Sequence, residues 1–190
     1  MYYIWIGCLL PEEFQKDLRW LCGEYNRELG LSTVAFDMPQ HISLKISFQV
    51  EPERAEPVTE YLTQRLSRES PFWVRLGRVE QLQNILWLPV EENPVLGRLH
   101  DMLDRELWER FGIPQHEFDK CYRFHSTLYM DDNVEKVSQM ADFLKDYIPE
   151  GPLKVEAFLT DITLDGTVDT LVKSTRIPMA GNFLEDTSHF

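Results

Sequence analysis

Two kinds of hydrophobic spacing alternate along the chain, and they predict strands and helices in a regular order. Apolar residues at every second position predict strands, because successive side chains of a strand point to opposite faces. Apolar residues three and four positions apart predict amphipathic helices. By the first pattern, strands are expected at residues 2–10, 41–50, 72–76, 85–90, 122–130, 153–159, 162–164 and 170–177. By the second, helices are expected at residues 11–29, 52–67, 94–111 and 134–147. The stretch 79–84 either extends the strand before it or forms a turn.

Proline and glycine mark the ends of two of these helices. Pro11 and Pro94 stand at the first helical position, where the missing N–H group has no helical partner to lose. Gly30 and Gly112 follow the last apolar residues, where a left-handed backbone commonly ends a helix. The helix boundaries are therefore expected at these four residues.

The order of the elements predicts an α+β fold with two similar lobes. A strand, a helix, a strand, a helix and a strand pair are followed by a helix, a strand, a helix and a strand pair, which suggests an internal duplication. Adjacent strand pairs favour antiparallel or mixed sheets over a doubly wound parallel sheet. We expect one domain over residues 1–190, with two antiparallel sheets facing a central cleft, helices outside and a loosely held tail at residues 179–190.

Composition restricts the partners of this domain. The formal net charge of −13 argues against a wide grip on long nucleic acid, which needs a basic surface. A small phosphorylated ligand held by a few local cations remains compatible with this charge. Residues 1–10 are apolar but lack a basic flank, so they predict a buried strand and no membrane partner. The three scattered cysteines fit reduced thiols in the cytoplasm.

Two strand segments carry the same short motif, a histidine followed by any residue, then serine or threonine, then an apolar residue. The first copy is HISL at residues 41–44, and the second is HSTL at residues 125–128. Strand alternation predicts that the histidine, the hydroxyl residue and the next polar residue share one face of each strand. These residues are His41, Ser43 and Lys45 in the first strand, and His125, Thr127 and Tyr129 in the second. The duplicated order predicts that both faces meet at the cleft.

The two tetrapeptides resemble the hallmark of the 2H phosphoesterase superfamily, which includes the 2′-5′ RNA ligase-like proteins and cyclic nucleotide phosphodiesterases. Residues 4–11, which end in Leu10-Pro11, also look like the first strand of that family. The residues after the first motif, Ile46-Ser47-Phe48, depart from its usual Phe-Leu-Gly and leave the subfamily open. The resemblance implies a bilobal fold with the site between its sheets.

The resemblance also implies hydrolysis of a 2′,3′-cyclic phosphate or a related phosphodiester, in a nucleotide or short RNA end, with no metal and no cofactor. Imidazole titrates near neutral pH, so one histidine can accept a proton while the other donates one. The residues alone leave open which histidine is the acid. The analogy with the family favours His41 as the acid and His125 as the base, with the roles exchanged in the reverse direction. Ser43 and Thr127 would bind the non-bridging oxygens of the phosphate.

Weaker expectations concern the residues around the motifs. Lys45 would add positive charge to the site, and Tyr129 would hydrogen-bond phosphate or stack on a base. His100 and His116 have acidic neighbours and are predicted to lie on the surface. The loops at residues 31–40 and 113–121, each ahead of a histidine strand, are where substrate specificity is expected.

Three other functions are compatible with the motifs. A non-catalytic module would keep the site to bind a nucleotide or RNA without turnover. A 2′-5′ RNA ligase would join RNA ends, although the acidic charge would repel long RNA. A metal site that uses both histidines would need a third ligand, which no recognisable spacing supplies.

Overall fold

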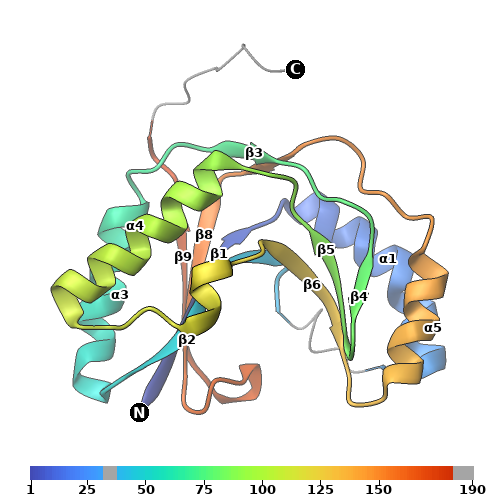
Figure 1. The fold of residues 1–190 in the computed structure, drawn as a ribbon, viewed down its shortest axis with the longest axis horizontal. Helices are drawn as coiled ribbons and strands as arrows, with labels where there is room; N and C mark the ends of the chain where they lie inside the picture. Colours follow the sequence, from blue (N-terminus) through green and yellow to red (C-terminus); the bar gives the residue numbers. More distant parts are fainter. Residues whose placement is uncertain (32–37, 182–190) are drawn as a thin grey trace.

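The computed structural model describes residues 1–31 and 38–181, which form an α+β fold with antiparallel sheets (Figure 1). The strands are β1 (Tyr2–Leu9), β2 (His41–Val50), β3 (Phe72–Val74), β4 (Glu80–Leu82), β5 (Ile85–Pro89), β6 (His125–Met130), β7 (Leu153–Val155), β8 (Ala157–Thr163) and β9 (Leu171–Pro178). The helices are α1 (Glu12–Leu29), α3 (Pro52–Leu66), α4 (Pro94–Phe111) and α5 (Val134–Leu144), with short 3₁₀ helices η1 (Glu117–Cys121) and η2 (Val168–Thr170). The predicted fold class is confirmed.

The first sheet has the strand order β2-β1-β8-β9, and every neighbouring pair is antiparallel. Its inner strands β1 and β8 contribute most of the buried positions of the sheet. One motif strand, β2, lies at the edge of this sheet, next to the amino-terminal strand. The first histidine is therefore carried on an edge strand.

The second lobe is built from a three-stranded sheet of order β4-β5-β6 and a two-stranded sheet of β3 and β7. An isolated antiparallel bridge between Leu76 and Val90 links the two pieces. The stretch 79–84 does not extend β3: it contains the separate strand β4, which pairs with β5, and then a turn at Gln83 with a positive φ of 53°. The second motif strand, β6, also lies at a sheet edge.

The helices that precede the two motif strands are exchanged between the lobes (Figure 1). Helix α4 follows β5 in the chain but packs on β2, and α3 packs on β1 and β8. Helix α1 follows β1 in the chain but packs beside α5, which covers β4 and β5. Each lobe is consequently assembled from both halves of the sequence.

The helix boundaries follow from the predicted proline and glycine positions. Gly30 and Gly112 adopt left-handed backbone angles, with φ of 59° and 62°, directly after α1 and α4. Asn93 precedes Pro94, and its side chain accepts hydrogen bonds from the N–H groups of Val95 and Leu96. These caps satisfy backbone groups that a helix end would otherwise leave unpaired.

The core runs through both lobes as one cluster of buried apolar side chains. In the part of the chain that the structure describes, none of the helices has the length and apolar character needed to span a bilayer. The part of the predicted tail that follows residue 181 lies outside the described residues.

We predict that the two lobes unfold in one cooperative transition, because exchanged helices link them. Leu99 on α4 is fully buried, so Leu99→Ala is expected to lower the free energy of unfolding by about 2–5 kcal/mol. Leu82 on β4 is 52% exposed, and the control variant Leu82→Ala is expected to change it by less than about 0.5 kcal/mol. Urea denaturation followed by tryptophan fluorescence and by circular dichroism measures both. Two separate transitions in the wild type would contradict the prediction.

Candidate active site

The two predicted catalytic histidines begin the two motif strands, and these strands contact each other across the lobes. His41 is the first residue of β2 and His125 is the first residue of β6. A buried hydrogen bond of 2.9 Å runs from Ser126 Oγ to Gln40 Oε1. Since Gln40 precedes His41 and Ser126 follows His125, this bond joins the side chains of two residues that are each adjacent to a histidine.

A chain of buried polar contacts anchors Gln40 to the first lobe. Its backbone N–H donates to Gln15 Oε1 at 3.1 Å, and Gln15 Nε2 donates to the carbonyl oxygen of Leu10 at 2.8 Å. The N–H of Leu10 in turn donates to the carbonyl oxygen of Gln40 at 3.0 Å. Gln40, the residue before the first histidine, is therefore fixed by hydrogen bonds to its backbone as well as by the one to its side chain.

Both imidazole rings are oriented by the same kind of hydrogen bond. His41 Nδ1 lies 2.7 Å from the carbonyl oxygen of Pro39, and His125 Nδ1 lies 2.7 Å from that of Arg123. A carbonyl oxygen only accepts, so Nδ1 carries the proton in each neutral ring. Nε2 is then the atom of each histidine with a lone pair for proton transfer.

A tryptophan from the neighbouring strand packs against each histidine. The ring centroids of Trp5 and His41 are 4.2 Å apart in an edge-to-face arrangement, and those of Trp87 and His125 are 4.3 Å apart. Trp5 Nε1 also donates to Ser43 Oγ at 3.0 Å. These contacts exclude water from one side of each ring and hold the serine hydroxyl beside the first histidine.

The surroundings lower the pKa of both histidines. For His41, burial is the largest cause, and it lowers the pKa to about 4 with a further contribution from the charge of His125. The hydrogen bond to Pro39 opposes this shift. For His125, burial and then the charge of Arg123 lower the pKa, against the hydrogen bond to the Arg123 carbonyl. The effect of His125 on His41 indicates that the two rings lie within electrostatic reach of each other.

The two predicted phosphate-binding hydroxyl residues lie on the same strands as the histidines. Ser43 and Thr127 are both half-buried, two residues after His41 and His125. Tyr122, which the sequence did not single out, makes a hydrogen bond with the side chain of Ser43, and burial raises the pKa of its phenol. Its position just after η1 gave no sequence signal, because the contact joins two segments that are far apart in the sequence.

The structure corrects the prediction that Lys45 and Tyr129 share a face with the histidines. A β-bulge follows each motif: one step along β1 corresponds to two steps along β2 at Leu44, and one step along β5 corresponds to two steps along β6 at Leu128. A bulge places two residues opposite one, which reverses the alternation beyond it. Lys45 and Tyr129 therefore turn into the interior, and each is only 1% exposed.

The buried surroundings of these two residues exclude them as direct substrate contacts. Lys45 Nζ forms ion pairs with Asp104 on α4 and, at 2.6 Å, with Asp119 on η1. Tyr129 interacts through its hydroxyl with the thiol of Cys22 on α1, and burial raises its pKa. Both residues thus bind their strand to a helix rather than to a ligand.

One of the two histidines predicted to lie on the surface is buried. His100 is 5% exposed, whereas His116 is exposed and caps the amino end of η1. His100, Asp104 and Asp119 bring ligand atoms within 4.8 Å of one another, a set of groups that could hold a metal ion. Lys45 Nζ already forms ion pairs with both carboxylates, where a cation would bind.

The two loops expected to determine specificity differ in what the structure describes. Residues 32–37 of the first lie outside the described part of the chain. Most of the second forms η1, which is attached to β2 by a hydrogen bond of 3.1 Å from the Ile46 N–H to Asp119 Oδ1. This second loop lies against the strand that carries His41.

Two histidine–hydroxyl strands, one from each lobe of an α+β fold, define the class of two-histidine phosphoesterases. The family model of the 2′-5′ RNA ligase superfamily matches residues 13–161, and the chain belongs to this superfamily. The resemblance predicted from the two tetrapeptides is confirmed.

Individual relatives agree with this assignment. The chain is 30% identical over 84 residues to the "Putative phosphoesterase GK0864" of Geobacillus kaustophilus (strain HTA426), a match that covers 43% of this chain and 47% of that protein. The chain thus spans about half the length of this curated relative.

Solved structures share the fold at lower identity. The crystal structure of E. coli LigT complexed with 3′-AMP has a TM-score of 0.57 and 19% identity, covering 93% of this chain and 94% of LigT. The crystal structure of TT0787 from Thermus thermophilus has a TM-score of 0.59 and 22% identity, covering 93% of this chain and 98% of that protein. At this identity, the likeness concerns the fold alone.

We predict that the pKa of His41 rises in a His125→Ala variant. The charge of His125 is one cause of the low value, and its removal relieves repulsion against the imidazolium of His41. Titration of the ring signals by NMR measures the shift. His116→Ala, which removes a histidine outside the pair, is the control and should leave the titration of His41 unchanged. An unchanged or lower pKa in His125→Ala would contradict the expected coupling.

We also predict that acidification destabilises the protein through His41. Its folded pKa is about 4, below the ordinary value of 6.5, so only the unfolded chain binds the proton between these two values. The contribution is zero above the ordinary pKa, and the free energy of unfolding then falls by up to about 1.4 kcal/mol per pH unit toward pH 4. Urea denaturation at pH 7 and pH 5 should show a smaller decrease in His41→Gln than in the wild type. An equal decrease in both proteins would disprove the link.

Proposed function

We propose that the protein is a metal-independent phosphodiesterase that hydrolyses 2′,3′-cyclic phosphates, or related phosphodiesters, of nucleotides or short RNA ends. The observation that carries this proposal is the matched anchoring of His41 and His125. Each Nδ1 is bonded to a backbone carbonyl, and each Nε2 is left for proton transfer. The Gln40–Ser126 hydrogen bond holds the two strands together beside the rings.

The reaction requires one proton acceptor and one proton donor on opposite sides of the phosphorus atom. A water oxygen attacks phosphorus while one imidazole Nε2 takes its proton. The bond from phosphorus to a ribose oxygen breaks, and the other imidazole gives that oxygen a proton. Ser43 and Thr127 donate hydrogen bonds to the non-bridging oxygens, where negative charge increases in the transition state.

Within this scheme, the family analogy makes His41 the acid and His125 the base. The pKa of His41, about 4, leaves this ring neutral at neutral pH in the ligand-free protein. A bound phosphate brings a negative charge, which favours the protonated imidazole and raises its pKa. The acid role therefore depends on substrate binding, and the two roles exchange in the reverse reaction.

The charges around the site fit a small anionic ligand. Lys45 is neutralised by its two carboxylate partners, so it adds no net charge to the surface of the site. Arg123 is two residues before His125, and its side chain is 65% exposed although it pairs with Glu80. This cation is available at the surface beside the second histidine. Solved structures of LigT with 3′-AMP and with ATP support a ligand of nucleotide size.

A second candidate function is nucleotide binding without turnover. The lowering of the pKa of both histidines favours it, because a site with two neutral imidazoles lacks a proton donor until an anion binds. RNA end ligation, the third candidate, uses the same groups in the reverse direction. The net charge of −13 opposes binding of long RNA outside the site.

We predict that the purified protein opens 2′,3′-cyclic nucleotides and that His41→Ala and His125→Ala each lower kcat by about 10²–10⁴-fold. Ser43→Ala and Thr127→Ala should each lower it by about 10²-fold, since each removes one donor to the phosphate. Product release from a panel of four cyclic nucleotides, followed by chromatography, measures these effects with the metal chelator EDTA present.

Ser138→Ala, which removes an exposed serine hydroxyl on α5, is the control and should keep wild-type activity. Full activity in either histidine variant would disprove the catalytic assignment. Binding of the nucleotides without any turnover by the wild type would replace the proposal with the binding function. Joining of RNA ends without hydrolysis would favour the ligase.

A further inference from the structure

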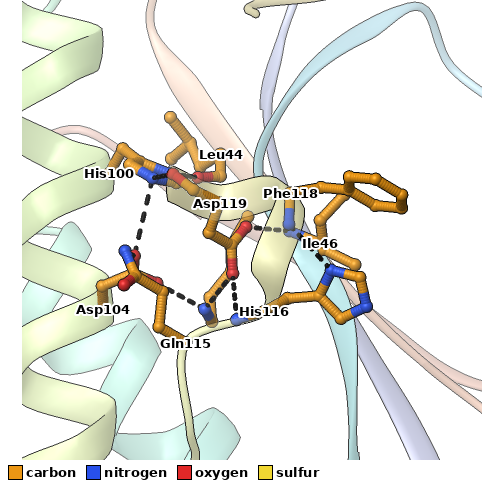
Figure 2. Close-up of polar contacts among 9 residues, drawn as sticks. Leu44, Ile46, His100, Asp104, Gln115, His116, Phe118 and Asp119 are labelled. Carbon is orange, nitrogen blue, oxygen red and sulfur yellow. Dashed lines mark hydrogen bonds and ion pairs between the residues drawn. The ribbon is translucent and has the colours of Figure 1, made fainter. Parts of the chain in front are cut away.

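Four ionisable side chains form a buried cluster next to the first motif strand, and Figure 2 labels three of them, His100, Asp104 and Asp119. Lys45 belongs to β2, His100 and Asp104 belong to α4, and Asp119 belongs to η1. Each of the four is at most 9% exposed. We call this set the β2–η1 charge cluster, because it joins the motif strand to the 3₁₀ helix through α4.

The lysine of the cluster pairs with both aspartates, and one of the aspartates also accepts hydrogen bonds from the backbone. Lys45 Nζ pairs with Asp104 and, at 2.6 Å, with Asp119. Asp119 also accepts from the N–H groups of Ile46 at 3.1 Å and His116 at 2.9 Å. Burial raises the pKa of Asp119, but these hydrogen bonds outweigh burial and lower it. Asp119 is therefore ionised and ties η1 to β2.

The histidine of the cluster faces only acceptors. His100 Nδ1 lies 2.7 Å from the carbonyl oxygen of Leu44, and Nε2 lies 2.9 Å from the carbonyl oxygen of Asp119. Nε2 is also 3.5 Å from a carboxylate oxygen of Asp104. A neutral imidazole has one N–H group and would direct a lone pair at one of the carbonyl oxygens. Two N–H groups, as in the imidazolium, satisfy both contacts.

With His100 protonated, the cluster is electrically balanced. Lys45 and His100 supply two positive charges, and Asp104 and Asp119 supply two negative charges. A buried charge is costly unless an opposite charge and hydrogen bonds compensate it. The titratable groups around the ring are Lys45 from β2, Asp119 from η1, Asp104 from its own helix and the phenol of Tyr122. Loss of the histidine proton would leave one uncompensated negative charge in the interior.

The same histidine is connected to Ser43 by two routes, through the backbone of Leu44 and through the ring of Tyr122. Its Nδ1 bond reaches Leu44, the extra residue of the bulge that follows Ser43. Its ring stacks on Tyr122, with centroids 4.9 Å apart and planes inclined by 23°. Tyr122 in turn makes a hydrogen bond with the Ser43 side chain. His100 therefore supports the hydroxyl group of Ser43 both through the backbone of Leu44 and through the ring of Tyr122.

We propose that His100 is a positioning residue of the phosphodiester site: as a buried imidazolium, it holds the bulge at Leu44 and the ring of Tyr122, and through them it directs the Ser43 hydroxyl toward the phosphate. This role rests on the proposed function for its kinetic effect. The charge state and the contacts of His100 are independent of any activity. His100 itself touches no reacting atom.

The first experiment determines the charge of His100 in the wild-type protein. NMR of protein labelled with ¹⁵N in histidine distinguishes a ring with protons on both nitrogens from either neutral tautomer. Because each ring nitrogen of His100 faces a carbonyl oxygen, we expect N–H groups on both of its nitrogens under the conditions of the activity assay, and on Nδ1 alone for His41 and His125. A His100 ring with a single N–H group would overturn the proposal, whatever the activity of the protein.

The second experiment is a double-mutant cycle on activity toward a 2′,3′-cyclic nucleotide. His100→Gln removes the charge and one of the two donors, and it should lower kcat by about 10-fold or more, because a small misplacement of a catalytic group is costly. In a Ser43→Ala background the same change should have less than about a 2-fold effect, since the group being positioned is gone. In a Thr127→Ala background, which alters the other strand, the full loss should persist. Equal losses in both backgrounds would overturn the positioning role and indicate general destabilisation.

Two further arms keep the test decisive. If His100→Gln does not fold, His100→Gln combined with Asp104→Asn restores the charge balance, and this double variant replaces it in the cycle. If the wild type turns over no cyclic nucleotide, the proposed function fails, and the cycle is repeated with the dissociation constant of inorganic phosphate as its readout. Phosphate binding that is weakened by His100→Gln only when Ser43 is present supports the positioning role. Equal weakening with and without Ser43, or no weakening in either background, overturns it.

Discussion

The hydrogen bond between Ser126 Oγ and Gln40 Oε1 is the contact on which the geometry of the candidate site depends. It is 2.9 Å long, it is buried, and it joins two edge strands that belong to different sheets. A buried hydrogen bond of this kind contributes only about 0.5–1.5 kcal/mol, but leaving one partner unpaired costs about 1–3 kcal/mol. Separation of the strands would leave the Ser126 hydroxyl and the Gln40 amide oxygen unpaired, at that cost in free energy. Because each partner is adjacent in sequence to a histidine, the bond restricts the distance between the two imidazoles more directly than the packing of the lobes does.

The exchanged helices provide a second set of contacts to the motif strands, in addition to the hydrogen bond between Ser126 and Gln40. In each motif strand, a bulge turns the residue after the tetrapeptide into the interior. In β2 that residue is Lys45, which pairs with Asp104 on α4, and in β6 it is Tyr129, which interacts with Cys22 on α1. Helices α4 and α1 each come from the other half of the chain. The bulge in each strand therefore turns one side chain toward a helix from the other half of the chain. The histidine and the hydroxyl residue of the same strand remain on the opposite face.

The sequence predicted the parts of this arrangement that depend on local order. The strand and helix succession, the antiparallel sheets and the superfamily were all evident from periodicity and from the two tetrapeptides, and the structure and the family match confirm them. The inward direction of Lys45 and Tyr129 was predicted wrongly, because alternation along a strand holds only until a bulge, and a bulge depends on the pairing with a neighbour. The burial of His100 was missed for a related reason. Its partners come from β2 and η1, and acidic neighbours in sequence are typical of an exposed helix face as well as of a buried ion pair.

Two nearly identical motifs give two different histidines because their surroundings differ. Burial lowers the pKa of His41 to about 4, and the strand that carries it is supported by the ion pairs of Lys45 with Asp104 and Asp119. His125 lies beside the exposed cation Arg123, and the strand behind it is supported by a phenol and a thiol. A pair of groups with different proton affinities can divide the roles of acid and base, whereas an equivalent pair has no intrinsic direction. The two motif strands thus supply the two imidazoles, and the differences between their surroundings distinguish them.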